Sequence, residues 1–145
     1  MAITTNAICN SFKKELLEAT HNFKSSGGNS FKLALYTSSA TLGKSTTSFT
    51  TDNQVSATGQ YASGGSALTN AGTSLSSDTA LVDFADLSFT GVTLTARGAL
   101  IFSDTASGDP AVCVLNFGSD KTATSGTFTI QFPAFTSSAA VIRIA

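Results

Sequence analysis

The chain has 145 residues, enough for one domain with its own hydrophobic core. Charged residues make up only 12% of the chain and the net charge is -1, while 11 residues are phenylalanine, so a disordered chain held open by charge repulsion is excluded. The same balance offers no basic surface for nucleic acid, so we do not expect nucleic acid as a partner. No segment approaches the roughly 20 apolar residues of a membrane span, so we do not expect a membrane as a partner either.

The first predicted element is an amphipathic helix over about residues 6–23. Thr5 or Asn6 is expected to cap its start, and the Ser-Ser-Gly-Gly sequence at 25–28 to end it. Its apolar stripe, at helical spacing, consists of Ile8, Phe12, Leu16, Ala19 and Phe23. This stripe either packs on the chain's own sheet or docks between subunits, and the sequence leaves both arrangements open.

Strands are predicted wherever short runs alternate apolar and polar residues between Gly, Ser, Asp and Pro. The runs are 31–37, 55–57, 67–69, 80–84, 92–102, 111–117, 127–132 and 140–145. The interval 38–68 exceeds the usual loop length and is expected to form an extended excursion or irregular edge strands. One helix followed only by strands predicts a mostly β fold. We expect a single domain over 1–145, with residues 31–145 forming an antiparallel β-sandwich or jelly-roll-like barrel covered by the helix.

Few residues are candidates for chemistry. His21 is the only imidazole, so a Ser-His-Asp or Cys-His mechanism would need it, but a place near the helix end favours a structural role. Asp83 and Asp86 are either paired carboxylates for acid–base work or, more simply, acceptors for turn N–H groups. Cys9 and Cys113 share no metal-ligand spacing with the histidine and are expected to be reduced, buried thiols. We therefore expect no enzyme, no catalytic residue, no metal and no cofactor.

Arg97 and Gly98 interrupt the longest predicted strand. If the apolar residues of 92–102 face inward, Arg97 faces outward, where it pairs with a carboxylate such as Asp83 or Asp86, or lies at a subunit contact. Gly98 indicates a bulge or the close approach of another segment. The sparse charge also leaves little repulsion between identical copies. The candidate interface residues are Ile8, Phe12, Leu16, Phe23, Arg97 and Gly98.

Several long segments carry a family resemblance. They are NAICNSFKKELLEATHNF, FKLALYTSSATLG, GQYASGGSALTNAG, LVDFADLSFTGVTLTARGALIF, AVCVLNFGSDKTATSGTFTIQFP and AVIRIA. Over nearly its whole length the chain resembles small virion structural proteins of tailed bacteriophages, including phages of cyanobacteria. The resemblance implies a decoration, or cement, protein that is made in the host cytoplasm and stabilises the outer surface of the capsid. It further implies a homotrimer bound to the major capsid protein at three-fold or local three-fold positions.

A tail or fibre-associated structural module is the alternative. In that version, Tyr36, Tyr61 or a Phe-lined loop is expected to contact a host glycan.

Overall fold

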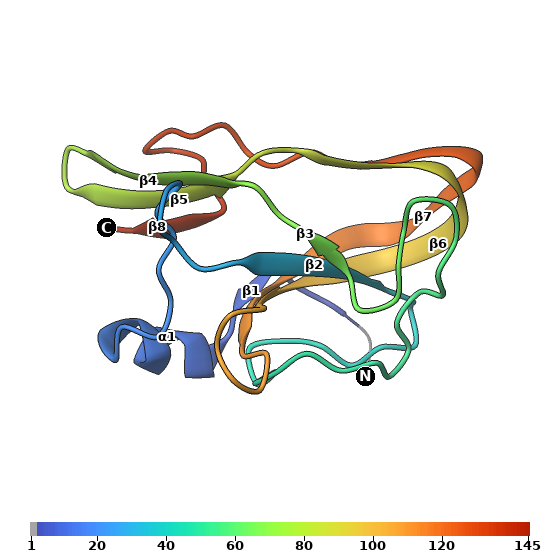
Figure 1. Ribbon diagram of the computed structural model, residues 1–145, viewed down its shortest axis with the longest axis horizontal. Helices are drawn as coiled ribbons and strands as arrows, with labels where there is room; N and C mark the ends of the chain where they lie inside the picture. Colours follow the sequence, from blue (N-terminus) through green and yellow to red (C-terminus); the bar gives the residue numbers. More distant parts are fainter. Residues whose placement is uncertain (1–2) are drawn as a thin grey trace.

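The computed structural model describes residues 3–145, and its fold is mostly β, as predicted. Two antiparallel sheets and one short helix form a sandwich-like arrangement (Figure 1). The five-stranded sheet has the order β1-β7-β6-β2-β3, and the three-stranded sheet has the order β4-β5-β8. The elements are β1 (Ala7–Ile8), α1 (Asn10–Leu17), β2 (Phe31–Tyr36), β3 (Ser66–Ala67), β4 (Asn70–Ser76), β5 (Thr79–Phe84), β6 (Leu87–Ser103), β7 (Ala111–Ile130) and β8 (Ile142–Ile144).

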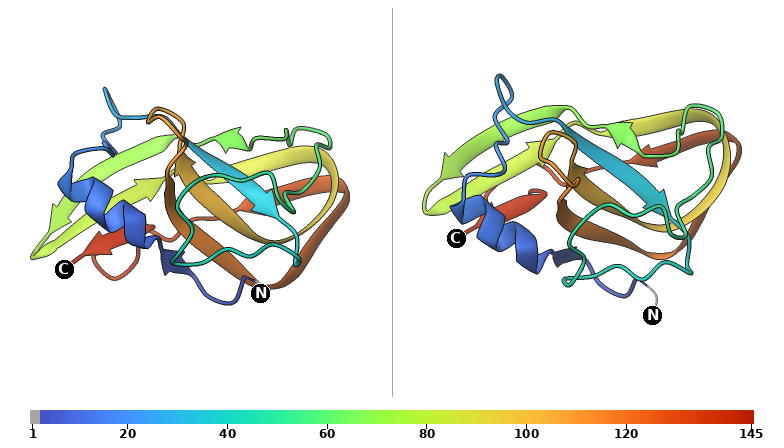
Figure 2. Two further views of the ribbon diagram at one scale, coloured as in Figure 1. Left: turned by 90° about the horizontal axis from the view of Figure 1, so that it is seen from below. Right: turned by 60° about the horizontal axis from the view of Figure 1, so that its bottom comes forward.

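A long ribbon of two strands joins the layers. β6 has 17 residues and β7 has 20, and the two pair antiparallel along most of their length. The ribbon folds over at one end of the molecule, so that each strand has one arm in each layer (Figures 1 and 2). Four register shifts interrupt the pairing, and the largest places residues 117–120 of β7 opposite Arg97 alone. Such bulges bend a strand pair, which explains how the ribbon turns from one layer into the other.

The core lies between the layers and is rich in aromatic rings. Phe23 and Phe31 stack with centroids 4.4 Å apart, and Phe84 from β5 meets both edge-on. Where β6 enters the core, buried Val92 and Leu94 alternate with exposed threonines, the pattern of a strand with one face inward. One connected cluster of buried side chains runs from the N-terminal segment to β8.

The helix is much shorter than predicted. The structure has a helix only over Asn10–Leu17 instead of about 6–23. Ile8 belongs to β1, which pairs with β7. After the helix, Ala19 adopts a positive φ of 59°, a left-handed conformation that stops the helix before residues 20–23.

The predicted helix cap is also wrong. Cys9, not Thr5 or Asn6, occupies the cap position, and its side chain makes no capping bond. The Asn6 side chain instead accepts a hydrogen bond from the main-chain N–H of Asn116 in β7, at 2.6 Å. The residues before α1 therefore belong to the sheet.

Most predicted strands exist, with changed bounds. The runs at 31–37, 80–84, 92–102 and 111–117 correspond to β2, β5, part of β6 and the first arm of β7. The run at 55–57 is not a strand, and the interval 38–65 is a loop with isolated bridges such as Tyr36–Gln54. The runs at 67–69, 127–132 and 140–145 are strands only in part, and β4 was not predicted.

Candidate functional site: an apolar groove beside β7

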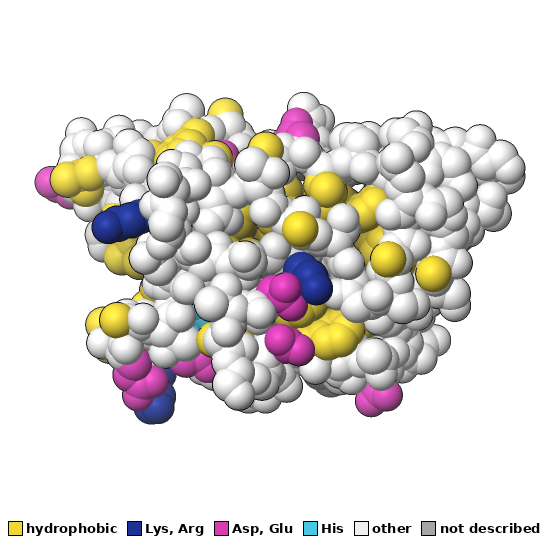
Figure 3. Space-filling view, in the orientation of Figure 1, with side chains coloured by type: hydrophobic (Ala, Val, Ile, Leu, Met, Phe, Trp, Pro, Cys, Tyr) yellow, Lys and Arg dark blue, Asp and Glu magenta, His cyan; other side chains and the backbone are white. Residues whose placement is uncertain are grey.

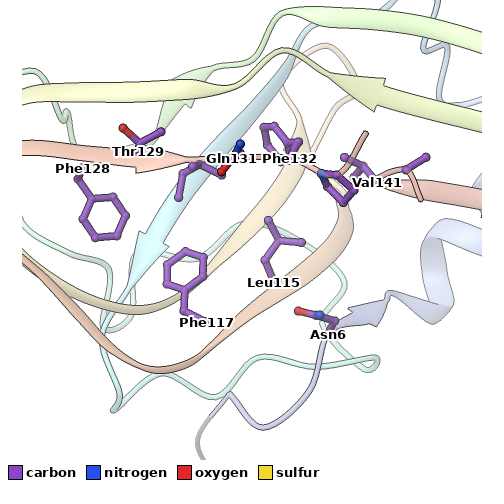
Figure 4. Close-up of a pocket in the computed structure, with 11 residues that line it drawn as sticks. Asn6, Leu115, Phe117, Phe128, Thr129, Gln131, Phe132 and Val141 are labelled. Atoms are coloured by element: carbon purple, nitrogen blue, oxygen red, sulfur yellow. The ribbon is translucent and has the colours of Figure 1, made fainter. Parts of the chain in front are cut away.

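A groove of about 370 Å³ opens between the two arms of β7 (Figure 4). Residues from the first arm, the second arm, the segment before β8 and the segment before β1 line it, and none of its lining residues is charged. We call this feature the β7 groove. Its principal residues are Leu115, Phe117, Phe128, Ile130, Val141 and Asn6.

The bend of β7 brings the groove's aromatic rings together. Phe117 on the first arm and Phe128 on the second have ring centroids 6.1 Å apart. Phe128 and Ile130 are buried, whereas Thr129 between them is exposed and its hydroxyl is 3.0 Å from that of Ser88 in β6. Figure 4 shows the Thr129 side chain directed away from Phe117, so Thr129 contributes main chain to the groove wall.

The second arm of β7 is a free strand edge. β1 pairs with β7 only at Val114 and Cys113. Residues 128–130 pair with β6 alone, and Thr127 lies at a register shift between β6 and β7. Among the described residues, no hydrogen bond joins the outer side of 127–130 to another segment. One rim of the apolar groove therefore carries main-chain donors and acceptors without partners.

The opposite rim is fixed by asparagines. Asn6 accepts a hydrogen bond from the N–H of Asn116, and the Asn116 side-chain amide donates to the carbonyl of Thr4 at 2.9 Å. These two bonds extend the attachment of the N-terminal segment beyond β1. This groove was not predicted from the sequence, because the bend of β7 separates its two walls along the chain. Phenylalanine and leucine at alternate positions near 115–117 and 128–132 were its only signal.

The predicted helix stripe packs within the chain itself. Phe12 and Phe23 are buried in the core and contact each other edge-on. Ile8 and Leu16 are half-buried against the same core. In this conformation, the aromatic part of the stripe presents no surface to a neighbouring subunit.

Arg97 makes an ion pair within the chain, and Gly98 lies in the interior. The Arg97 guanidinium donates to Asp120 across 2.9 Å, not to Asp83 or Asp86 as predicted, and remains partly exposed. Gly98 is buried, and a Cβ built on it would lie 2.4 Å from the carbonyl oxygen of Leu115. The expected bulge and close approach at Gly98 are confirmed, but the residue offers no surface to a partner.

His21 is a core residue beyond the helix, not a polar residue at its end. Its side chain is fully buried and is close to the rings of Phe12, Phe23 and Phe31. Its Nε2 lies 2.7 Å from a carboxylate oxygen of Glu15, and its Nδ1 has no partner among the described residues. The helix-dipole interpretation of this residue was therefore wrong.

The two candidate carboxylates bind main-chain N–H groups. Asp83 is buried, which raises the pKa of its carboxyl, and it accepts a bond from the N–H of Phe84 at 2.9 Å. Asp86 accepts from the N–H of Phe132 at 2.8 Å. Within residues 3–145, no group of three or more His, Cys, Asp or Glu side chains is arranged to hold a metal ion. In the same part of the chain, no helix has the length and apolar content needed to cross a membrane.

The tyrosines and cysteines are internal. Tyr36 donates to the carbonyl of Thr50 at 2.6 Å, and the Tyr61 hydroxyl accepts from the N–H of Leu35 at 2.9 Å. Both tyrosines are buried, so neither is exposed for the glycan contact expected in the tail-module alternative. Cys9 and Cys113 are free and buried, as predicted.

Comparison of the chain with protein-family models, with curated proteins and with solved structures finds no match.

Proposed function

We propose that the protein is a structural component of a tailed-phage virion that decorates the capsid as a cement protein. The observation that carries the proposal is the resemblance of nearly the whole sequence to small virion proteins of such phages. In this role, the chain binds the major capsid protein on the outer surface of the head as a homotrimer, at three-fold or local three-fold positions. The proposal assigns it no chemical step.

The doubled-over ribbon of β6 and β7 is suited to such a role. Its strands run continuously through both layers, so the covalent main chain of β6 and of β7 links one layer to the other. Figure 3 shows few charged side chains on the face it presents, and the chain as a whole has only 17 charged residues other than histidine, eight basic and nine acidic. Repeated contacts of this kind need not be strong individually, because a rigid lattice supplies a high effective concentration.

One end of the molecule offers an apolar contact surface. The end of α1, the turn between β4 and β5, and the C-terminus are all at this end, with α1 below the three-stranded sheet in the view of Figure 1 (Figures 1 and 2). Leu17, Leu75 and Ile144, which belong to these elements, are 91%, 73% and 54% exposed. In the three-stranded sheet, Leu75 and Ile144 both pair with Ala80 and so lie in one cross-strand row. Exposed apolar side chains such as the Leu75–Ile144 pair are typical of interaction surfaces.

Cryo-electron microscopy of the virion that carries this protein tests the proposal. We expect trimeric density for the chain on the outside of the head, over three-fold or local three-fold positions. Density in the tail alone would favour the tail-module alternative. Absence of the chain from purified particles, measured by mass spectrometry, would contradict both.

A binding assay tests the apolar end directly. The substitutions Leu17→Lys and Leu75→Lys are expected to reduce binding of the purified protein to capsids that lack it, because each places a charge in the contact. Ser119→Lys, at an exposed position in β7, is the matched control and is expected to bind normally. Equal binding by all three variants would contradict a role for this end.

A further inference from the structure

We propose that the β7 groove binds an extended, uncharged peptide segment of a partner protein, which adds to the free edge of β7 as an extra strand along residues 127–130. The proposal does not rest on capsid decoration. It concerns any partner that supplies such a segment, and it follows from the edge, the groove beneath it and the absence of charge in the lining.

The edge of β7 at 127–130 can accept a further strand. In an antiparallel pair, alternate residues direct their N–H and C=O groups to opposite sides, so a strand paired on one side keeps half of these groups for the other. Within 127–130, residues 128–130 pair with β6 alone and Thr127 lies at a register shift. The four residues include neither a charged residue nor proline, the features that usually protect an edge. Four residues of edge span about 13 Å, enough for a short added strand.

The other sheet edges are less suitable. β1 and β3 have two residues each, and β8 has three with Arg143 at its centre. β4 is longer, but the segment 24–29 covers its start, because the Asn70 side-chain amide donates to carbonyl oxygens of Lys24 and Asn29. The edge at 127–130 also forms a wall of the β7 groove, through Phe128, Thr129 and Ile130.

The groove supplies side-chain recognition. Strand addition takes its affinity from main-chain hydrogen bonds and its specificity from pockets that accept alternate side chains. Here the side chains that point from an added strand toward the groove would meet Phe117, Phe128 and Leu115. Apolar residues at alternate positions of the partner therefore fit, with the residues between them facing solvent.

The absence of charged residues in the groove lining favours an uncharged segment. None of the groove's residues is charged, so a Lys or Asp side chain directed into it would lose its hydration without gaining an ionic partner. The volume of about 370 Å³ lies at the lower end of the range for small-molecule pockets. A compact apolar molecule is therefore the competing occupant, and the experiment must separate it from a peptide.

The probe is a capped synthetic peptide, Thr-Val-Thr-Leu-Thr-Val-Thr, titrated into the full-length protein and followed by amide NMR. We expect shifts and slowed amide exchange concentrated at residues 127–130. A copy of the peptide that is N-methylated at alternate amide bonds keeps the side chains but loses hydrogen bonds, and should bind at least about tenfold more weakly. A copy with Asp at the valine and leucine positions should lose binding. Indole serves as the compact apolar probe.

Two protein variants locate the site. Thr127→Lys places a charge on the edge, and Ser119→Lys places the same charge on β7 outside the groove; both positions are exposed, so both proteins should fold, which thermal melts will verify. We expect only Thr127→Lys to weaken peptide binding. Equal binding of the N-methylated peptide, equal effects of the two lysines, or binding of indole without any peptide would each overturn strand addition. So would the lack of any peptide response at millimolar concentration. None of these outcomes bears on capsid decoration, which cryo-electron microscopy of the virion tests separately.

Discussion

His21 donates a hydrogen bond from Nε2 to the carboxylate of Glu15 across 2.7 Å, and this bond ties the segment after α1 back to the helix. The imidazole is fully buried, and the Glu15 side chain is only 20% exposed. Buried polar groups require partners, because they have given up their hydrogen bonds to water. The pair therefore fixes the return of the chain from α1 toward β2.

Removing the carboxylate should destabilise the fold. Glu15→Ala leaves both ring nitrogens of His21 buried without a partner, and we expect a loss of about 1–3 kcal/mol in the free energy of unfolding, measured with urea. Glu18→Ala is the matched control on the same helix, because Glu18 pairs with exposed Lys14 and should contribute little. Equal losses in the two variants would show that the bond to His21 is not stabilising.

The packing of α1 within its own chain predicts a second contrast. Phe12 is buried among Phe23 and His21, so Phe12→Ala should cost about 3–5 kcal/mol of unfolding free energy. Leu17→Ala on the same helix should leave stability unchanged, because that side chain is almost entirely exposed. If Phe12→Ala instead kept normal stability but lost self-association, the helix would pack on a neighbouring subunit in solution.

The length of the helix could not be predicted from its apolar spacing. That spacing records which residues are buried, and a side chain can be buried from a strand or an irregular segment as well as from a helix. Ile8 is covered because β1 pairs with β7, and Phe23 because an extended segment carries it onto Phe31. Their intervals from Phe12 match a helical period, although neither residue is helical.

Alternation predicted the strands that have one buried face. The part of β6 from Val92 to Ala96 shows it clearly, whereas β2 is buried at five of its six positions. β4 was missed because its sequence, Asn-Ala-Gly-Thr-Ser-Leu-Ser, has one large apolar residue and that residue is exposed. Residues 118–126 resemble a loop in composition, yet they continue β7. Residues 121–123 and Gly126 pair with β6, and hydroxyl contacts such as Thr95–Thr122 cross the ribbon.

The β7 groove could not be predicted from the sequence. Its walls come from two arms of one strand, and their meeting depends on the bend at the register shifts of the ribbon. By contrast, the buried thiols were predicted. The close approach at Gly98 was also predicted, because a glycine inside a strand often marks a place where another segment comes near the main chain.

The close approach at Gly98 predicts a third contrast. Gly98→Ala places a methyl group 2.4 Å from the carbonyl oxygen of Leu115 and 2.9 Å from Ile3, so the paired strands must separate. We expect destabilisation of about 1–3 kcal/mol or more, seen as a lower urea midpoint. Gly43→Ala is the matched control, because a Cβ there meets nothing within 4 Å. An unchanged midpoint for Gly98→Ala would show that the strands do not approach so closely.

Buried thiols predict a loss of stability in alkaline solution. Burial raises the pKa of Cys9 to about 11 and that of Cys113 to about 12, from an ordinary value of 9.0. The unfolded chain therefore releases these protons at lower pH than the folded chain. The contribution of these two thiols to the free energy of unfolding should be constant below about pH 8, and should fall as the pH rises from about 9 toward 11.

Urea unfolding at a series of pH values measures this decrease in the free energy of unfolding. A cysteine-free variant separates the contribution of the thiols from that of the tyrosines. In the double variant Cys9→Ala and Cys113→Ala, the decrease should begin only near pH 10, where the tyrosines of the unfolded chain ionise. Burial also raises the pKa of Tyr36 and Tyr61. The free energy of unfolding of the double variant should therefore keep decreasing above about pH 10. Identical pH profiles for the parent and the double variant would contradict the thiol contribution. A parent profile that stays flat to pH 11 would contradict the burial of both kinds of group, because a group with the same pKa in the folded and unfolded chains contributes no pH dependence.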